Sequence, residues 1–266
     1  MPPAERFQDD FWGTPTATLE WCEENYDVTF FIAEFYNTVS NLAFIVPSVL
    51  GIIFASEDKL EKRYIFSFLA TLMIGISSTA FHLTLKLEMQ MWDELSMLWG
   101  VSFFVYSMFE CYSSPKSTNY TLALCLFIYS LTISTAYIML QEPVFHQVAF
   151  SLLTFAIILR AILCSSGSAE SKFLIWYSIA LYLSAFILWL IDNNFCDSLR
   201  FLREKLPFPL SSLFQFHAWW HILIAIANQG QIYYSCMLRR DHLKQSYKLQ
   251  RWLSVIPYLR VVKEHV

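Results

Sequence analysis

Long apolar stretches separated by short polar segments dominate the sequence. Seven of them are each near the ~20 residues that a helix needs to cross a bilayer. They lie at 35–55, 63–83, 91–110, 120–140, 143–164, 173–192 and 214–237. The stretches are continuous and lack two-residue alternation, which predicts helices rather than strands. The pattern therefore predicts an all-α membrane protein, a seven-transmembrane-helix bundle.

Composition supports the membrane assignment. Of the 266 residues, 56% are hydrophobic and only 15% are charged, which is too apolar for an ordinary soluble domain. No linker separates two domains, so we expect an acidic tail at 1–34, the bundle at 35–237 and a basic tail at 238–266. The expected surroundings are the bilayer, with no nucleic-acid partner; the sequence does not indicate an oligomeric state.

Charge asymmetry between the two ends predicts the orientation. Residues 1–33 hold Arg6 against seven carboxylates, whereas residues 237–266 hold seven Lys and Arg against two carboxylates. The basic end should be cytosolic and the N-terminus lumenal, with the first helix inserting itself because no signal peptide precedes it. The sequon at Asn119 would then face the cytosol and stay unglycosylated.

Three histidines are expected at one depth of the bundle. His82 lies at the lumenal end of the second stretch, and His217 and His221 lie one helical turn apart at the start of the seventh. Three imidazoles that leave the fourth position of a tetrahedral zinc ion open are typical of a catalytic site. The alternative is that membrane histidines are hydrogen-bonded packing residues, which is our interpretation of His146.

Two further polar residues share that depth. Ser78 lies one turn before His82 on the same helical face, and Asp93 begins the third stretch. A carboxylate beside such a metal could deprotonate its water, and a hydroxyl could stabilise an oxyanion. Ser78 and Asp93 are therefore the candidate catalytic residues.

The tail before the first stretch is dense in oxygen ligands: Glu20, Glu23, Glu24, Asn25, Asp27 and Glu34. Calcium takes six to eight such ligands. The spacing does not match an EF-hand, so a solvated acidic tail remains the alternative. Cys22 in this tail and Cys196 in the sixth loop both fall on the oxidising lumenal side, where they form either a disulfide or two free thiols.

Four ordered motifs resemble the alkaline ceramidase family, of the phytoceramidase-like type, over essentially the whole chain. They are WCEENYDVTFFIAEFYNTVSNL at 21–42, SSTAFHLTLKLEMQMWDEL at 77–95, WLIDNNFCDSLR at 189–200 and QFHAWWHIL at 215–223. The wider group of seven-helix zinc proteins that this family resembles includes the adiponectin-type receptors.

The resemblance implies a role for each candidate residue. It implies zinc on His82, His217 and His221, with Ser78 and Asp93 as catalytic residues beside the metal. It also implies a disulfide between Cys22 and Cys196. It further implies calcium in the tail, on positions that match Glu20, Trp21 (through its backbone carbonyl), Glu23, Asn25 and Glu34. Glu20 departs from the aspartate that relatives carry, which bears on calcium affinity.

The function implied is zinc-dependent hydrolysis of ceramide, stimulated by calcium, to a sphingoid base and a free fatty acid. The expected location is the membrane of the endoplasmic reticulum, the Golgi or both. Two alternatives are a zinc-containing receptor of the adiponectin type and a metal transporter that uses the paired histidines. The stretch YKLQRWLSVIPYLRVV in the basic tail is expected either to lie on the cytosolic leaflet as an amphipathic segment or to be a plain basic tail.

Overall fold

The computed structural model describes residues 11–114, 117–164, 168–252 and 256–261. Parts of the two predicted tails, at 1–10 and 262–266, lie outside the described residues. The long helices are α2 (Leu42–Glu57), α3 (Lys62–Thr84), α4 (Leu87–Phe109), α5 (Tyr120–Leu140), α6 (Pro143–Leu163), α7 (Ala169–Asn194) and α9 (Phe216–His242). The shorter elements are α1 (Phe35–Ser40), α8 (Cys196–Lys205), the 3-10 helix η1 (Leu210–Phe214), β1 (Tyr247–Trp252) and β2 (Ile256–Val261).

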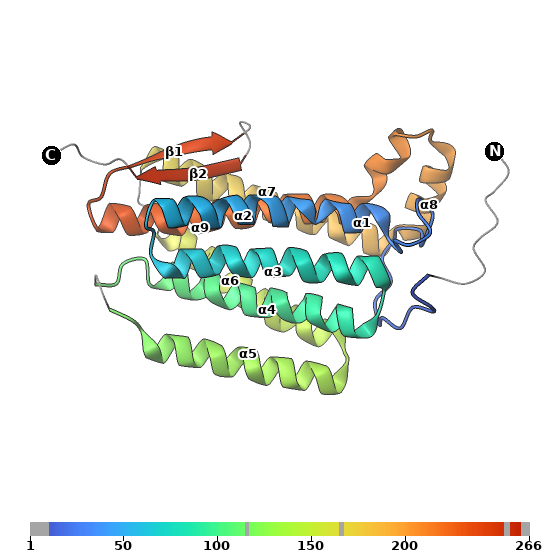
Figure 1. The fold of residues 1–266 in the computed structure, drawn as a ribbon, viewed down its shortest axis with the longest axis horizontal. Coiled ribbons are helices and arrows are strands. Elements are labelled where there is room, and N and C mark those ends of the chain that lie inside the picture. The colour runs from blue at the N-terminus through green and yellow to red at the C-terminus, as the bar shows by residue number, and fades with distance from the viewer. Residues whose placement is uncertain (1–10, 115–116, 165–167, 253–255, 262–266) are drawn as a thin grey trace.

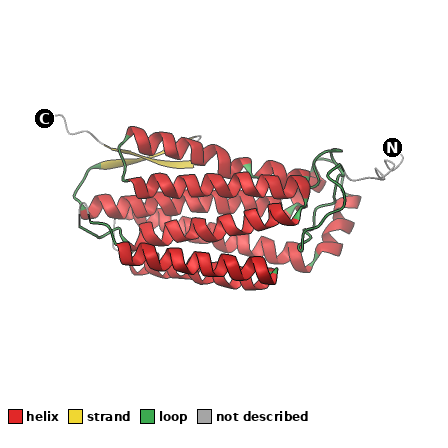
Figure 2. Cartoon of the chain, turned by 60° about the horizontal axis from the view of Figure 1, so that its bottom comes forward, coloured by secondary structure: helices red, strands yellow, loops and turns green. Residues whose placement is uncertain are grey.

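The long helices lie side by side in one bundle (Figures 1 and 2). The N-terminal tail and α8 are at one end of it, and the β-hairpin is at the other (Figure 1). α9 packs against α1, α2, α3, α4 and α7, so it is the central helix. This arrangement confirms the all-α prediction and places the starts of α9 and α4 beside the end of α3.

Local sequence explains several helix starts. Asn119 precedes α5 and accepts the backbone N–H of Leu122 through its side chain, and Ser168 accepts the N–H of Ser171 in the same way at α7. Pro143 is the first residue of α6, where its missing N–H removes no helical hydrogen bond. The short stretches between the apolar segments therefore carry the signals that begin the next helix.

Five segments of the described residues are long and apolar enough to cross a membrane. They are Phe35–Glu57, Lys62–Thr84, Tyr120–Leu140, Pro143–Leu163 and Ala169–Asn194. α4 and α9 are equally long but more polar. Much of that polarity is buried inside the protein, since Asn228, Gln229 and Gln231 of α9 are all buried. The seven-span count remains a prediction.

The structure corrects the expectation for the connection between the sixth and seventh apolar stretches and shows how the basic tail folds. The polar stretch 192–209, expected to be a connection, continues α7 to Asn194 and then forms α8, whose Leu199 and Arg203 are buried. Within the described residues of the basic tail, β1 and β2 form an antiparallel hairpin with Tyr247 opposite Val261. Tyr247 and Leu249 lie two residues apart on β1 and both pack onto the hydrophobic core, which is the spacing of side chains on one face of a strand. Tyr258 of β2 packs onto the same core.

The largest apolar core lies toward the hairpin end of the bundle. Tyr64, Phe68, Met108, Tyr234 and Met237 are fully buried there. A much smaller cluster, built on Ala33, Phe81 and Leu85, closes the opposite end beneath the N-terminal tail. Polar side chains therefore concentrate at the tail end.

Candidate metal centre

The three predicted zinc ligands come together at the tail end of the bundle. His82 lies in the last turn of α3, and His217 and His221 lie in the first turns of α9. One ring nitrogen from each lies within 4.8 Å of the other two, and all three side chains are buried. Within the described residues, this is the one cluster of histidine, cysteine and carboxylate ligands with metal-binding spacing.

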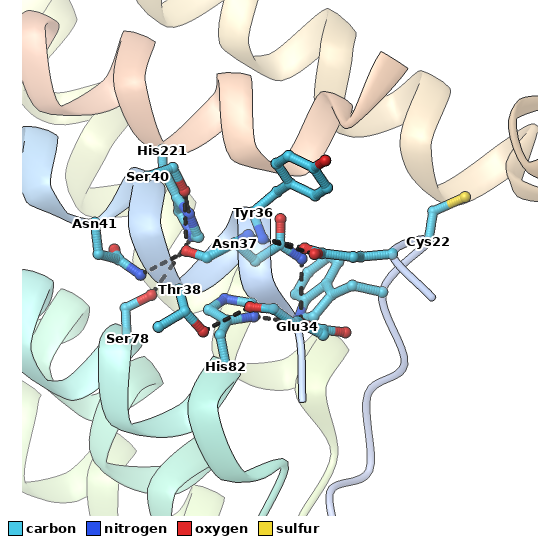
Figure 3. A network of polar contacts seen from close by, with 12 residues as sticks. Cys22, Glu34, Tyr36, Asn37, Thr38, Ser40, Asn41, Ser78, His82 and His221 are labelled. Carbon is cyan, nitrogen blue, oxygen red and sulfur yellow. Dashed lines mark hydrogen bonds and ion pairs between the residues drawn. The ribbon is translucent and has the colours of Figure 1, made fainter. Parts of the chain in front are cut away.

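Two of the rings are oriented by oxygen atoms on their Nδ1 side. Nδ1 of His82 lies 2.5 Å from Oε2 of Glu34, and Nδ1 of His221 lies 2.7 Å from Oγ of Ser40 (Figure 3). Metal-binding histidines commonly use one nitrogen for such a partner, which fixes the ring and leaves the other nitrogen for the metal. The Nε2 atoms of His82 and His221 are therefore available to a shared ion.

His217 is held by stacking rather than by an oxygen partner. The indole of Trp21 stacks on its ring at a centroid distance of 3.9 Å, with Trp220 on the same helix at 5.2 Å. Nδ1 of His217 is buried and has no hydrogen-bond partner among the described residues. A buried polar atom of this kind is costly unless something binds it, so the donor set fits zinc.

The two candidate catalytic residues are both buried at this end of the bundle. Oγ of Ser78 lies 3.5 Å from Nε2 of His221, one helical turn deeper than His82 (Figure 3). Asp93 is in the second turn of α4, which packs along α3. Its Oδ1 atom is buried without a hydrogen-bond partner among the described residues. The Asp93 oxygen is therefore available to a ligand or a water molecule, whereas the Ser78 hydroxyl contacts His221.

The predicted calcium residues lie around one polar cavity of about 830 Å³ beneath the tail. Glu20, Trp21, Asn25 and Glu34 line it. Asn25 is exposed, and the backbone carbonyl of Trp21 already accepts a hydrogen bond of 3.5 Å from Arg200. The oxygen donors suit calcium, but a complete coordination shell would require the tail to adjust.

Glu23, the fifth member of that set, fixes the start of the first helix. Its two carboxylate oxygens accept the backbone N–H groups of Tyr36 at 2.6 Å and Asn37 at 2.8 Å. Burial, together with a smaller contribution from Glu34 close by, raises the pKa of the Glu23 carboxyl to about 8. Burial likewise raises the pKa of Glu34 to about 8. A cation bound between them would favour the ionised form of both.

A disulfide joins Cys22 to Cys196 and ties the tail to the start of α8. The link is reinforced by Arg203, whose Nη2 donates to the carbonyl of Cys22 at 2.6 Å, and by Arg200, whose Nε donates to it at 3.1 Å. Asp192 at the end of α7 accepts the backbone N–H of Cys22 at 3.4 Å. The tail is therefore anchored over the histidines, and the alternative of two free thiols is wrong.

Sequence reasoning missed the second partners of the histidines. The contacts of Ser40 with His221 and of Glu34 with His82 left no recognisable motif, because the two residues of each pair are far apart along the chain. A buried network on α4 was missed too: the hydroxyl of Tyr137 donates to Glu94, and the Gln90 amide donates to Glu94 at 3.0 Å. His146 lies beside Glu94, 3.8 Å away, as a packed ring rather than a metal ligand.

Comparison with known proteins shows the family. The family model for ceramidases matches residues 13–260, which include the three histidines, Ser78, Asp93 and the anchored tail. The chain belongs to the ceramidase family. It is 46% identical over 248 residues to alkaline ceramidase 3 of Mus musculus, covering 93% of each chain.

More distant ceramidases align over most of their length as well. The chain is 30% identical to alkaline ceramidase YPC1 of Saccharomyces cerevisiae, covering 88% of this chain and 78% of the yeast protein. It is 27% identical to an alkaline ceramidase of Arabidopsis thaliana, covering 95% and 96%. Membership of a family of hydrolases speaks against both the receptor and the transporter alternatives.

Proposed function

We propose that this ceramidase-family chain is a zinc-dependent amidohydrolase that cleaves ceramide within the membrane to a sphingoid base and a free fatty acid. The observation that carries the proposal is the convergence of three buried imidazoles from two helices, with Ser78 beside them. His82, His217 and His221 would hold the zinc ion. When bound there, zinc would lower the pKa of a water molecule and polarise the amide carbonyl.

The protein's own residues supply the proton transfers. Asp93 accepts a proton from the attacking water and donates it to the amide nitrogen as the C–N bond breaks, so that the amine leaves neutral. Its free Oδ1 atom on α4 is suited to this exchange. The new C–O bond gives the fatty acid, and the cleaved nitrogen gives the sphingoid base.

Ser78 is placed to stabilise the transition state. Its hydroxyl lies 3.5 Å from Nε2 of His221, so it faces the point on which the histidines converge. Donation from this hydroxyl to the developing oxyanion would be stronger in the transition state than in the amide, which is the condition for accelerating the reaction.

We further propose that calcium binds in the polar cavity under the tail and stimulates the enzyme without taking part in the chemistry. Glu23 and Glu34 support this role, because one fixes the start of α1 and the other contacts His82. A cation held by both carboxylates would stabilise the tail over the site. We propose seven spans and residence in the endoplasmic reticulum or Golgi. We also propose a lumenal N-terminus and a cytosolic C-terminus, supported by the charge asymmetry between the two ends.

The test is release of sphingoid base from a long-chain ceramide by the purified full chain in detergent. Wild-type protein should release it, and His217→Ala should not. His242→Ala is the matched control, since this exposed histidine lies at the other end of the same helix. Equal turnover by His217→Ala and wild type would overturn the proposal.

A further inference from the structure

A second cavity, of about 690 Å³, lies between α3, α4 and α5. α4 lies between the other two helices and packs against both (Figure 1). The cavity includes Arg63 in the first turn of α3, whereas His82 is in the last turn. Nineteen residues at 1.5 Å each put the two roughly 30 Å apart, so this cavity is separate from the metal centre.

The walls of this groove are aromatic and lie exposed on the outside of the folded chain. Phe66 of α3, Phe103 of α4 and Phe127 of α5 line it, and each of them is exposed in the folded chain. Ser102 and Ser130 close its floor by a hydrogen bond of 2.8 Å between α4 and α5. The lining runs over about ten residues of α5, or ~15 Å, which matches the upper part of one acyl chain.

The mouth of the groove is cationic. Lys62 and Arg63 lie there with Glu61. A second carboxylate, Glu110, lies close by and accepts the side-chain amide of Asn119 at 3.0 Å. The Glu61 carboxylate is shared, because Arg63 lies 2.6 Å from one of its oxygens and Arg239 2.6 Å from the other. Lys62 is exposed and makes no ion pair among the described residues. Three cations, Lys62, Arg63 and Arg239, therefore lie near two carboxylates at this mouth, and Lys62 is the exposed one.

Two helices also begin at this mouth. α3 starts at Lys62, and no side chain caps its first N–H groups; α5 starts at Tyr120, beside the exposed hydroxyls of Ser117 and Thr118. Helix N-termini present free N–H groups and a partial positive charge, which together favour a phosphate. The uncapped start of α3 thus supports the same ligand as Lys62 and Arg63.

We propose that this groove binds one anionic glycerophospholipid, with its phosphate at Lys62 and the start of α3 and one acyl chain among the phenylalanines. The predicted orientation places the mouth in the cytosolic leaflet, where anionic lipids are concentrated. A zwitterionic lipid would bring a quaternary ammonium against Lys62 and Arg63, so the site selects for net negative charge. The lipid would bridge α5 to α3 and α4, which carry Ser78 and Asp93 at their other ends.

The experiment is native mass spectrometry of the full chain, delipidated in detergent, with added phosphatidylglycerol or phosphatidylcholine of identical acyl chains. Wild type should retain one phosphatidylglycerol in preference to phosphatidylcholine. Lys62→Glu should reduce that retention by at least about fivefold, the effect of roughly one charge near an anionic lipid. Lys172→Glu, the same charge change at an exposed lysine of α7 outside the groove, should leave it unchanged.

Ala123→Trp provides a second test that leaves the charges intact. Ala123 is exposed on the groove face of α5, so an indole there would fill the space for the acyl chain. Retention of phosphatidylglycerol should be lost. Undiminished retention in either Lys62→Glu or Ala123→Trp would overturn the proposal, as would equal retention of the two lipids by wild type.

Discussion

Nδ1 of His82 lies 2.5 Å from Oε2 of Glu34, with both side chains buried. Glu34 ends the N-terminal tail and also accepts the side-chain amide of Asn37 at 3.1 Å. The tail is thus connected directly to a proposed zinc ligand. A carboxylate in this position fixes the tautomer and orientation of a metal-binding imidazole and raises its basicity.

Glu34→Gln should weaken zinc binding by about 10- to 100-fold. The neutral amide oxygen can still accept the imidazole N–H, but it lacks the negative charge of the carboxylate. Zinc affinity measured by competition with a chelator checks this. Glu24→Gln is the control, since Glu24 pairs with Arg203 at 3.0 Å rather than with any of the three histidines. Equal affinities for Glu34→Gln and wild type would show that the contact does not tune the metal.

Ser78→Ala should lower kcat by roughly 10²–10³-fold with little change in zinc content, as expected when one oxyanion donor is removed. Ser77→Ala is the neighbouring control: its hydroxyl bonds to Ser96 at 2.8 Å instead of facing His221. Steady-state hydrolysis of ceramide by zinc-loaded protein checks both variants. A similar rate for Ser78→Ala and Ser77→Ala would remove Ser78 from the mechanism.

Stability without calcium should fall as pH rises. The pKa of Glu23 and of Glu34 rises from an ordinary 4.5 to about 8 in the folded chain. Between these values the unfolded chain binds fewer protons than the folded one, so stability decreases until about pH 8. The folded carboxyls then ionise, and calcium should restore stability by binding them.

The melting temperature in detergent, measured from about pH 5 to about pH 9 with chelator or with calcium, checks this titration. Glu23→Gln should flatten the curve obtained in chelator. If the melting temperature of wild type in chelator instead rises steadily with pH up to 8, the two carboxyls are not the groups that titrate.

Removing the disulfide should destabilise the tail. Cys22 and Cys196 are separated by 174 residues, and opening a loop of that size costs on the order of 2–5 kcal/mol. Cys196→Ser should therefore lower the unfolding free energy and expose the tail to protease. Cys125→Ser, at an exposed free cysteine, should change neither. An intact, protease-resistant tail in Cys196→Ser would mean that Arg200 and Arg203 suffice to anchor it.

Much of this site was predictable because the chain alternates across the bundle. His82 near the end of one helix and His217 near the start of another must share a depth, whatever the packing between them. The helical period then places Ser78 on the same face of its helix as His82, and His221 on the same face as His217. Apolar length similarly predicted the long helices to within a few residues of their observed ends.

Details that depend on packing could not be predicted in this way. Which nitrogen of His221 is left for the proposed zinc ion depends on Ser40, 181 residues away. Helix α8 is mostly polar, and its fold depends on Leu199 and the disulfide to the tail. The hairpin at the other end packs its second strand, β2, against α2 and α9. Leu249 and Tyr258 contact the hydrophobic core there. Apolar length carries no information about such pairings.

Zinc content per chain tests the central claim most directly. Purified wild-type protein that hydrolyses ceramide should contain one zinc ion per chain by elemental analysis, and His82→Ala should contain none and be inactive. A fully active wild-type preparation without stoichiometric zinc would contradict the three-histidine zinc site.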